Sequence, residues 1–242
     1  MKLCFIIACK VYKNYKSYLP FTIKNINEFY PNSTIILVDN NSKYSEYYNI
    51  FKNEQNIILL ENTSSCKFEL GAYNFATKYI IDNNLYFDYY ACIQDNVVLV
   101  NKVDFNYLQK NMILACPTAT FYFYRSQNLH IDVLKELNLY NPYEEFLCCS
   151  WNSWIVSHVN LINIYNLTKN LQITIRKHSE QTERYMGKIL KMLNNNTEYS
   201  IDGPSELHTY NCYNVDPTLE STKLLNYCFI KVVQNKNELT PE

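Results

Sequence analysis

Short apolar segments alternate with longer amphipathic segments through the first hundred residues, and this alternation limits the possible folds more than any other feature. The apolar runs occupy residues 3–8, 33–38, 56–61 and 89–93. The segments 17–30 and 70–83, together with a shorter one at 46–52, have helical periodicity. Alternation of strand and helix is typical of a parallel sheet covered by helices. The sequence therefore predicts an α/β fold with a mostly parallel central sheet and helices on both faces.

The second half of the chain is less regular, although it shows no linker or internal repeat. An apolar segment at 97–100 continues the strand before it, and further strands are expected at 112–116, 118–124 and 153–157. Helices are expected at 131–137, 160–166 and 180–194. We predict a single domain over residues 1–230, followed by a C-terminal tail at 231–242.

Glycine is scarce, with 3 residues in 242, and this excludes two common phosphate-binding devices. Gly71, Gly187 and Gly203 are too far apart to form a GxGxxG fingerprint or a GxxxxGK[ST] loop. Any phosphate site in this chain must use other groups. Asparagine is abundant, with 33 residues, but an AT-rich genome would produce the same bias without functional selection.

Charge and hydropathy indicate a soluble protein. The formal net charge of −1 gives no general attraction to nucleic acid or to an acidic membrane surface, so we expect no nucleic-acid partner. The apolar run Leu3–Ala8 is too short to span a bilayer, and no later run is long enough. The nine cysteines lie mostly in apolar runs and include no CxxC pair, which favours a reducing, cytoplasmic location over a zinc site.

Polar residues close each of the first four expected strands. Strand one ends at Lys10, strand two at 39–42, strand three at Glu61 and Asn62, and strand four at 94–96. In an open α/β sheet, ligands bind at the carboxyl ends of the parallel strands. Each of these ends is also compatible with an ordinary solvated turn, but four in succession predict a binding site.

Three segments resemble nucleotide-sugar-dependent glycosyltransferases of the GT-A fold. They are Ile35-Ile36-Leu37-Val38-Asp39-Asn40-Asn41-Ser42, Glu69-Leu70-Gly71-Ala72-Tyr73-Asn74-Phe75-Ala76 and Ala91-Cys92-Ile93-Gln94-Asp95-Asn96-Val97-Val98-Leu99. The resemblance covers residues 3–100 well and continues more weakly to about residue 215. It implies a Rossmann-like GT-A fold and transfer of a sugar, which we expect to be UDP-linked, to a hydroxyl acceptor such as a glycan.

The resemblance also implies a set of donor-binding residues. The strand-two Asp would recognise the nucleoside, and the Gly-Ala-x-Asn helix would lie near the donor. The expected donor-binding residues are Ala8, Cys9, Lys10, Asp39, Asn40, Gly71, Asn74 and Gln94. Lys67 and Arg125 are further cations that could meet the diphosphate.

A divalent metal, Mn²⁺ or Mg²⁺, is implied after strand four, because the charge of a sugar diphosphate needs neutralising and hard oxygen ligands suit these ions. The family places two acidic residues there, whereas this chain has Gln94 and Asn96 on either side of Asp95. Three readings stay open: Asp95 holds the metal with help from Asn96 and from His208, the protein depends weakly on metal, or it is inactive.

The acceptor side is expected to involve Trp151 and Trp154, although both also suit a core, and the start of the 180–194 helix. An inverting transfer needs a general base, for which Glu183 is the first candidate and Glu180 the second. Asp132 and Glu145 are more distant candidates.

Two alternative functions stay open. A non-catalytic nucleotide- or carbohydrate-binding protein on the same fold would explain the altered acidic motif. A nucleotidyltransferase shares the Rossmann-like core, but such enzymes usually carry a glycine-rich loop after strand one, and Cys9-Lys10-Val11-Tyr12-Lys13 has no glycine.

Overall fold

A computed structural model describes residues 1–11, 18–103, 105, 114–115, 135–136, 138, 149, 152–193, 210–213 and 229–233. Its centre is a six-stranded sheet in the order β3-β2-β1-β4-β7-β6. The strands are β1 (Leu3–Cys9), β2 (Thr34–Asp39), β3 (Ile57–Glu61), β4 (Tyr89–Gln94), β6 (Leu114–Ala115) and β7 (Trp154–Ser157). The strands β1 to β4 pair in parallel, and β7 pairs antiparallel with β4 and β6. The predicted mostly parallel sheet is confirmed.

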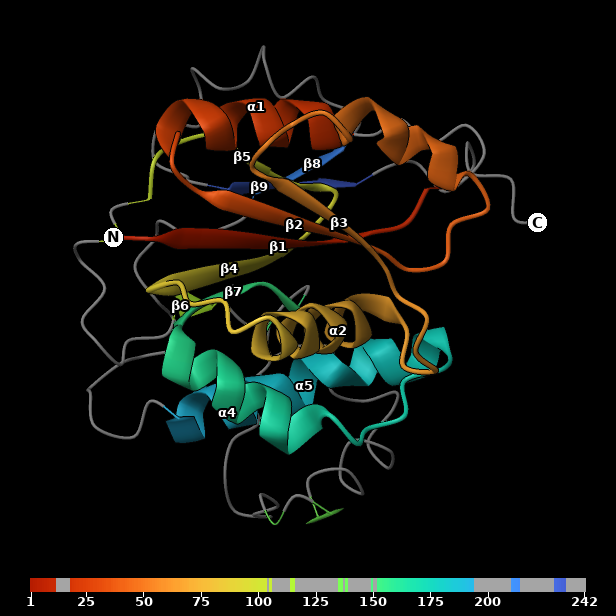
Figure 1. Cartoon of the computed structure of the whole chain (residues 1–242). Coiled ribbons are helices and arrows are strands. Elements are labelled where there is room, and N and C mark those ends of the chain that lie inside the picture. Colours follow the sequence, from red (N-terminus) through yellow and green to blue (C-terminus); the bar gives the residue numbers. More distant parts are fainter. Residues whose placement is uncertain are drawn as a thin grey trace.

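Helices cover both faces of this sheet, as predicted (Figure 1). On one face lie α1 (Leu19–Phe29) and a 3₁₀ helix, η1 (Ser45–Phe51). On the other lie α2 (Phe68–Asp82), α4 (His158–Thr168) and α5 (Arg176–Leu193). Among the described residues, no helix is both long and apolar enough to cross a membrane.

The first strand shows why its sequence is apolar without interruption. All seven residues of β1 are buried. Cys4, Ile6 and Ala8 pack into the core beneath α2, α4 and α5, whereas Phe5 and Ile7 pack into the core on the α1 side. A strand buried on both faces needs apolar side chains at every position.

A second, smaller sheet has the order β5-β9-β8, and its strands are β5 (Val97–Leu99), β8 (Tyr210–Tyr213) and β9 (Phe229–Val233). The prediction that residues 97–100 continue strand four is therefore wrong, because Val97–Leu99 pairs antiparallel with β9. The predicted tail also begins too early. Residues 231–233 belong to β9, which lies between β5 and β8.

The late helix begins earlier than its capping residues suggested. The sequence places its start at residue 180 behind His178 or Ser179, but α5 begins at Arg176 and contains both. The expected strand at 118–124 and most of the expected helix at 131–137 lie outside the described residues.

Candidate functional site

The strand order creates a topological switch point between β1 and β4. From β1 the chain moves outward through β2 to β3, then returns to place β4 on the other side of β1. In open α/β sheets, ligands bind in the crevice outside the carboxyl ends of the strands at such a point. Lys10 follows β1 and Asp95 follows β4, so both lie where this rule expects a ligand.

Backbone contacts join the strand ends at this edge. The Lys10 N–H donates to Asp95 Oδ2 over 3.0 Å, and the Asp95 N–H donates to the Ala8 carbonyl over 3.0 Å. The Asn40 N–H donates to the Cys9 carbonyl over 2.9 Å. The predicted donor-site residues Ala8 and Cys9 are buried, so they take part here through their backbone carbonyls. Asp95 is half-buried, and its carboxylate joins the end of β4 to the residue that follows β1.

The carboxylate of Asp39 is 7% exposed and organises the loop after β2. It accepts the Ser42 N–H over 3.1 Å and a short hydrogen bond from the Ser42 hydroxyl, while the Tyr48 hydroxyl donates to it over 3.4 Å. The Val11 N–H donates to Ser42 Oγ over 2.8 Å, which ties the loop after β1 to the same carboxylate. Asp39 is therefore held in one orientation.

The thiol of Cys9 is buried and close enough to both carboxylates to be affected by their charges. Burial raises its pKa well above the ordinary value, and the charges of Asp95 and Asp39 raise it further. Cys9 is consequently a neutral thiol, which is a poor nucleophile and a poor metal ligand.

Two buried amides hold the loop that leads from β3 into α2. Asn62 Nδ2 donates to Asn40 Oδ1 and to the Cys66 carbonyl, each over 2.9 Å. Asn40 Nδ2 donates to the Phe68 carbonyl over 3.1 Å. Phe68 has a φ of 62°, a left-handed conformation that is strained for a bulky side chain. The predicted donor residue Asn40 therefore anchors a strained helix start as well as the strand edge.

Gly71 lies where this loop crosses the first turn of α2. A Cβ at residue 71 would lie 2.4 Å from the Cys66 carbonyl oxygen, much closer than atoms can pack. Packing alone therefore requires glycine at this position, independently of any ligand.

The side chain of Asn74, another expected donor residue, packs α2 against α4. Its Nδ2 donates to the Thr168 carbonyl over 3.2 Å, and the Thr168 hydroxyl donates to Asn74 Oδ1 over 3.0 Å. Asn74 is 8% exposed and Thr168 is fully buried. The structure thus gives Asn74 a packing role between two helices.

Glu69 is a site residue that the sequence analysis did not assign. Gln94 Nε2 donates to Glu69 Oε1 over 3.0 Å, and the Ser179 hydroxyl donates to Glu69 Oε2 over 2.7 Å. The carboxylate thus joins the end of β4 to the first turn of α5. The available signal was an acid in the first turn of the helix that carries Gly71, but a first-turn acid is common for reasons of helix dipole alone.

The acceptor-side residues have separate positions. Glu183 is half-buried on α5, and its carbonyl accepts the Cys149 N–H over 2.6 Å. Trp154 is 1% exposed in β7, with its ring edge-on to Tyr73 at 5.0 Å. Trp154 is therefore a core residue rather than an acceptor platform, because β7 is an interior strand of the sheet.

The remaining expected residues are only partly described. Lys67 is engaged locally, since its Nζ donates to the Asn62 carbonyl over 2.8 Å. The following lie outside the described residues: Trp151, His208, Arg125, Asp132, Glu145 and the side chain of Glu180.

The oxygen atoms offered by the side chains at the end of β4 are of the type that binds a hard divalent cation. Asp95 offers a carboxylate, and Gln94 and Asn96, both half-buried, offer amide oxygens. Within the ranges that the structure describes, no three His, Cys, Asp or Glu residues lie together as a metal-binding group. Among the described residues, the 94–96 motif would therefore offer a metal one carboxylate and neutral amide oxygens.

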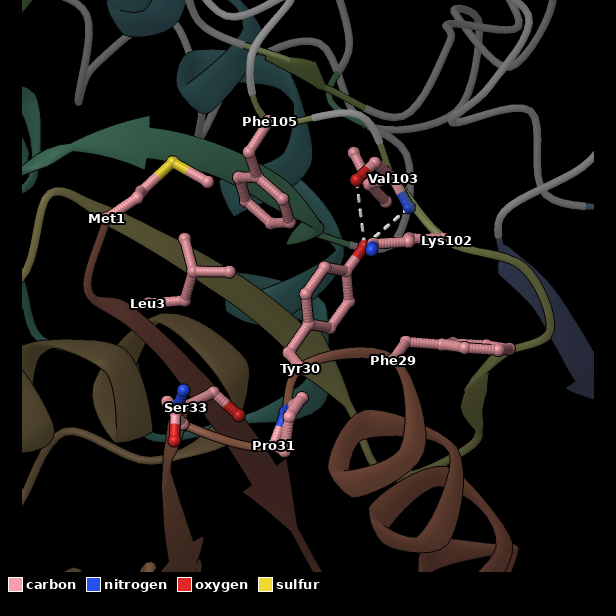
Figure 2. Close-up of a pocket in the computed structure, with 10 residues that line it drawn as sticks. Met1, Leu3, Phe29, Tyr30, Pro31, Ser33, Lys102, Val103 and Phe105 are labelled. Atoms are coloured by element: carbon pink, nitrogen blue, oxygen red, sulfur yellow. Dashed lines mark hydrogen bonds between the residues drawn. The ribbon is translucent and has the colours of Figure 1, made fainter.

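A separate cavity of about 460 Å³ lies at the opposite edge of the sheet (Figure 2). It is lined by the start of β1, by Phe29 at the end of α1 with residues 30–33 after it, and by Lys102, Val103 and Phe105. The Tyr30 hydroxyl donates to the Val103 carbonyl over 2.8 Å within it. Because ligands of such sheets bind at the carboxyl ends of the strands, this cavity lies away from the candidate site.

Together these features define an α/β protein with a Rossmann-like, mostly parallel sheet and with polar residues joined across its topological switch point. No protein-family model matches the sequence, and no curated protein is significantly similar to it.

Proposed function

We propose that this protein is a glycosyltransferase of the GT-A type, which moves a sugar from a UDP-linked donor to a hydroxyl acceptor. The observation that carries the proposal is the position of Asp95, hydrogen-bonded to the Lys10 N–H across the switch point between β1 and β4. The oriented Asp39 carboxylate lies at the end of the neighbouring strand β2. The three segments that resemble the family, at 35–42, 69–76 and 91–99, therefore meet at one edge of the sheet.

Asp39 suits recognition of the nucleoside. A carboxylate accepts about four hydrogen bonds in all, and hydroxyl groups such as those of a ribose are suitable donors. Ser42 and Tyr48 already supply three to Asp39, so about one position is left for a ribose hydroxyl. Ser42 and Tyr48 hold this carboxylate in place before any ligand arrives. An acceptor that is already ordered loses less entropy on binding.

The diphosphate would lie beside Lys10 and Asp95. Asp95 would hold the divalent cation with the oxygens of Gln94 and Asn96, and His208 is proposed as a further ligand. When bound, such a cation neutralises the diphosphate and stabilises it as a leaving group. The exposed Lys10 side chain follows β1 directly and would add positive charge at the same edge.

Glu183 is proposed as the general base for an inverting transfer. It lies one turn after Ser179 in α5, and Ser179 is linked through Glu69 to the end of β4. The base would therefore be carried by a helix attached to the donor site. Trp151 and Glu180 remain proposed acceptor contacts.

Thermal unfolding with a panel of nucleotide sugars and Mn²⁺ tests the proposal. We expect stabilisation by a UDP-sugar and by UDP, because a ligand that binds only the folded state raises its stability. Asp95→Ala should abolish the Mn²⁺-dependent part of this stabilisation. Asp88→Ala is a matched control at the other end of β4, where the Asp88 carboxylate also accepts a backbone N–H, from Lys2 over 2.6 Å. Absence of any shift in the wild-type protein would reject the proposal.

A non-catalytic binding protein is the second candidate, favoured by the single carboxylate in the 94–96 motif. It predicts binding of the same ligands without turnover. Release of free UDP over time, lowered in Glu183→Gln, would exclude it.

A further inference from the structure

Glu69 lies between the proposed donor site at the end of β4 and helix α5, which carries the proposed base. One carboxylate oxygen accepts from Gln94 at the end of β4, and the other accepts from Ser179 in the first turn of α5. The two partners are 25 and 110 residues away from Glu69 in the sequence. Ser179 is 8% exposed, while Glu69 and Gln94 are half-buried, so the bridge is partly buried.

The bridge determines which atom of Gln94 points toward Glu69. An ionised carboxylate only accepts hydrogen bonds, so the Gln94 atom facing it must be the amide nitrogen. The carbonyl oxygen of Gln94 is then turned away from Glu69. This oxygen is the atom that a cation or a donating hydroxyl of the ligand would need.

The bridge also sets the place of α5. Ser179 and Glu183 are four residues apart in this helix, and residues at this spacing lie on the same face. The hydrogen bond from Ser179 to Glu69 therefore helps to hold the turn that carries Glu183, together with the Cys149 N–H that donates to the Glu183 carbonyl. Truncation of Glu69 would release the amide of Gln94 and remove one of the contacts that hold this turn.

The backbone before Glu69 is strained in a way that supports this placement. Phe68 has a φ of 62°, and its carbonyl accepts from Asn40 Nδ2 over 3.1 Å. Strain of this kind persists where the surroundings over-determine a conformation. Here it directs the first turn of α2, and with it Glu69, toward the end of β4.

We propose that Glu69 is a positioning residue of the donor site, which orients the Gln94 amide and holds the Glu183 turn of α5 against it. The proposal rests on the glycosyltransferase function proposed above. Glu69 takes no proton and touches no reacting atom in this role, so its geometry matters and its charge does not.

The test compares Glu69→Ala with Glu69→Gln in steady-state release of UDP from the UDP-sugar that stabilises the protein most. Alanine removes both hydrogen bonds, so kcat should fall about tenfold or more. The Kd of UDP with Mn²⁺ should rise as well, because the Gln94 oxygen that would help to hold the cation is no longer oriented. Glutamine can accept from Gln94 through its oxygen and donate to Ser179 Oγ through its nitrogen. It should keep kcat within about threefold of the wild type.

Asp82→Ala is the matched control, because it removes a carboxylate from the last turn of the same helix, where Asp82 pairs only with the exposed Lys78 among the contacts described. It should leave kcat unchanged. If Glu69→Ala does not fold, Ser179→Ala removes one of the two hydrogen bonds with a much smaller change. It should lower kcat about fivefold with the Kd of UDP preserved.

The outcomes separate this proposal from the function on which it rests. Equal kcat values in Glu69→Ala and Asp82→Ala would overturn the positioning role while leaving the glycosyltransferase intact. A loss in Glu69→Gln as large as that in Glu69→Ala would also overturn it, because the carboxylate charge itself would then be needed. If the wild-type protein binds no nucleotide, the proposed function fails, and the role of Glu69 within it fails too.

Discussion

Gly71→Ala tests how the loop after β3 crosses the first turn of α2. The added Cβ would lie 2.4 Å from the Cys66 carbonyl oxygen, whereas ordinary contact begins at 3.4 Å, so the carbonyl would have to move by about 1.0 Å. That carbonyl accepts from Asn62 Nδ2 and from Ser64 Oγ, each over 2.9 Å. The next residue, Lys67, is held in turn by its N–H, which donates to the Ile173 carbonyl over 2.8 Å.

Two opposing effects set the magnitude. Alanine is the better helix former by up to about 1 kcal/mol, which alone would stabilise the variant. Overpacking costs about 1–3 kcal/mol, and weakening the two hydrogen bonds to the displaced carbonyl costs about 1 kcal/mol each. The net expectation is a loss of about 2–4 kcal/mol in the free energy of unfolding. For a chain of this size, this corresponds to a fall in Tm of about 4–16 °C.

Urea unfolding followed by circular dichroism, together with Tm, measures this difference. Asp82→Ala in the same helix is the control, since its ion pair with Lys78 is exposed to solvent and its loss should leave the stability essentially unchanged. If Gly71→Ala is as stable as the wild type, or more stable, the gain in helix propensity outweighs any steric cost. The inference that the Cys66 carbonyl leaves no room for a Cβ at residue 71 would then be refuted.

Two further predictions concern buried groups. Thr168→Val should lower the free energy of unfolding by about 1–3 kcal/mol, because the buried Asn74 side chain loses a hydrogen-bond donor. The affinity for UDP should not change. Weaker UDP binding with unchanged stability would instead indicate that Asn74 contacts the donor. Burial raises the pKa of the Cys4 and Cys9 thiols above their ordinary value of 9.0, so unfolding releases protons in alkali. Stability should be retained below pH 9 and fall above it, with a smaller fall in Cys9→Ala; urea midpoints that do not change between pH 8 and 10 would contradict this.

Much of the first hundred residues could be predicted from the sequence. The predicted and observed bounds of β1, β2, β3 and β4 differ by at most one residue at each end. An apolar run of this length and a turn after it are local signals, read within a few residues of the strand itself. The same holds for α2, whose periodicity located it within two residues.

Pairings between distant segments could not be predicted in this way. Val97–Leu99 looks like a continuation of β4, but it pairs with β9 more than a hundred residues later. A short apolar run does not by itself specify which of several distant strands it will pair with. The start of α5 was misplaced for a related reason, since Ser179 reads locally as a cap but donates its hydroxyl to Glu69.

The same limit applies to individual site residues. Trp154 suits an acceptor face or a core equally well in the sequence, and the interior position of β7 places it in the core. Glu69 reads as an ordinary first-turn acid until the fold brings Gln94 and Ser179 to its two oxygens.

The sequence by itself determined the α/β class, the order of the first strands and helices, and the polar residues that end each strand, because these follow from local periodicity and turn chemistry. Only the tertiary structure decided what those polar groups do. It engaged Asn74 with Thr168, set Asp95 against the Lys10 N–H, and brought Glu69 to the end of β4. The physical reason is that a hydrogen bond needs its two atoms about 3 Å apart, and for residues far apart in the chain only packing sets that distance.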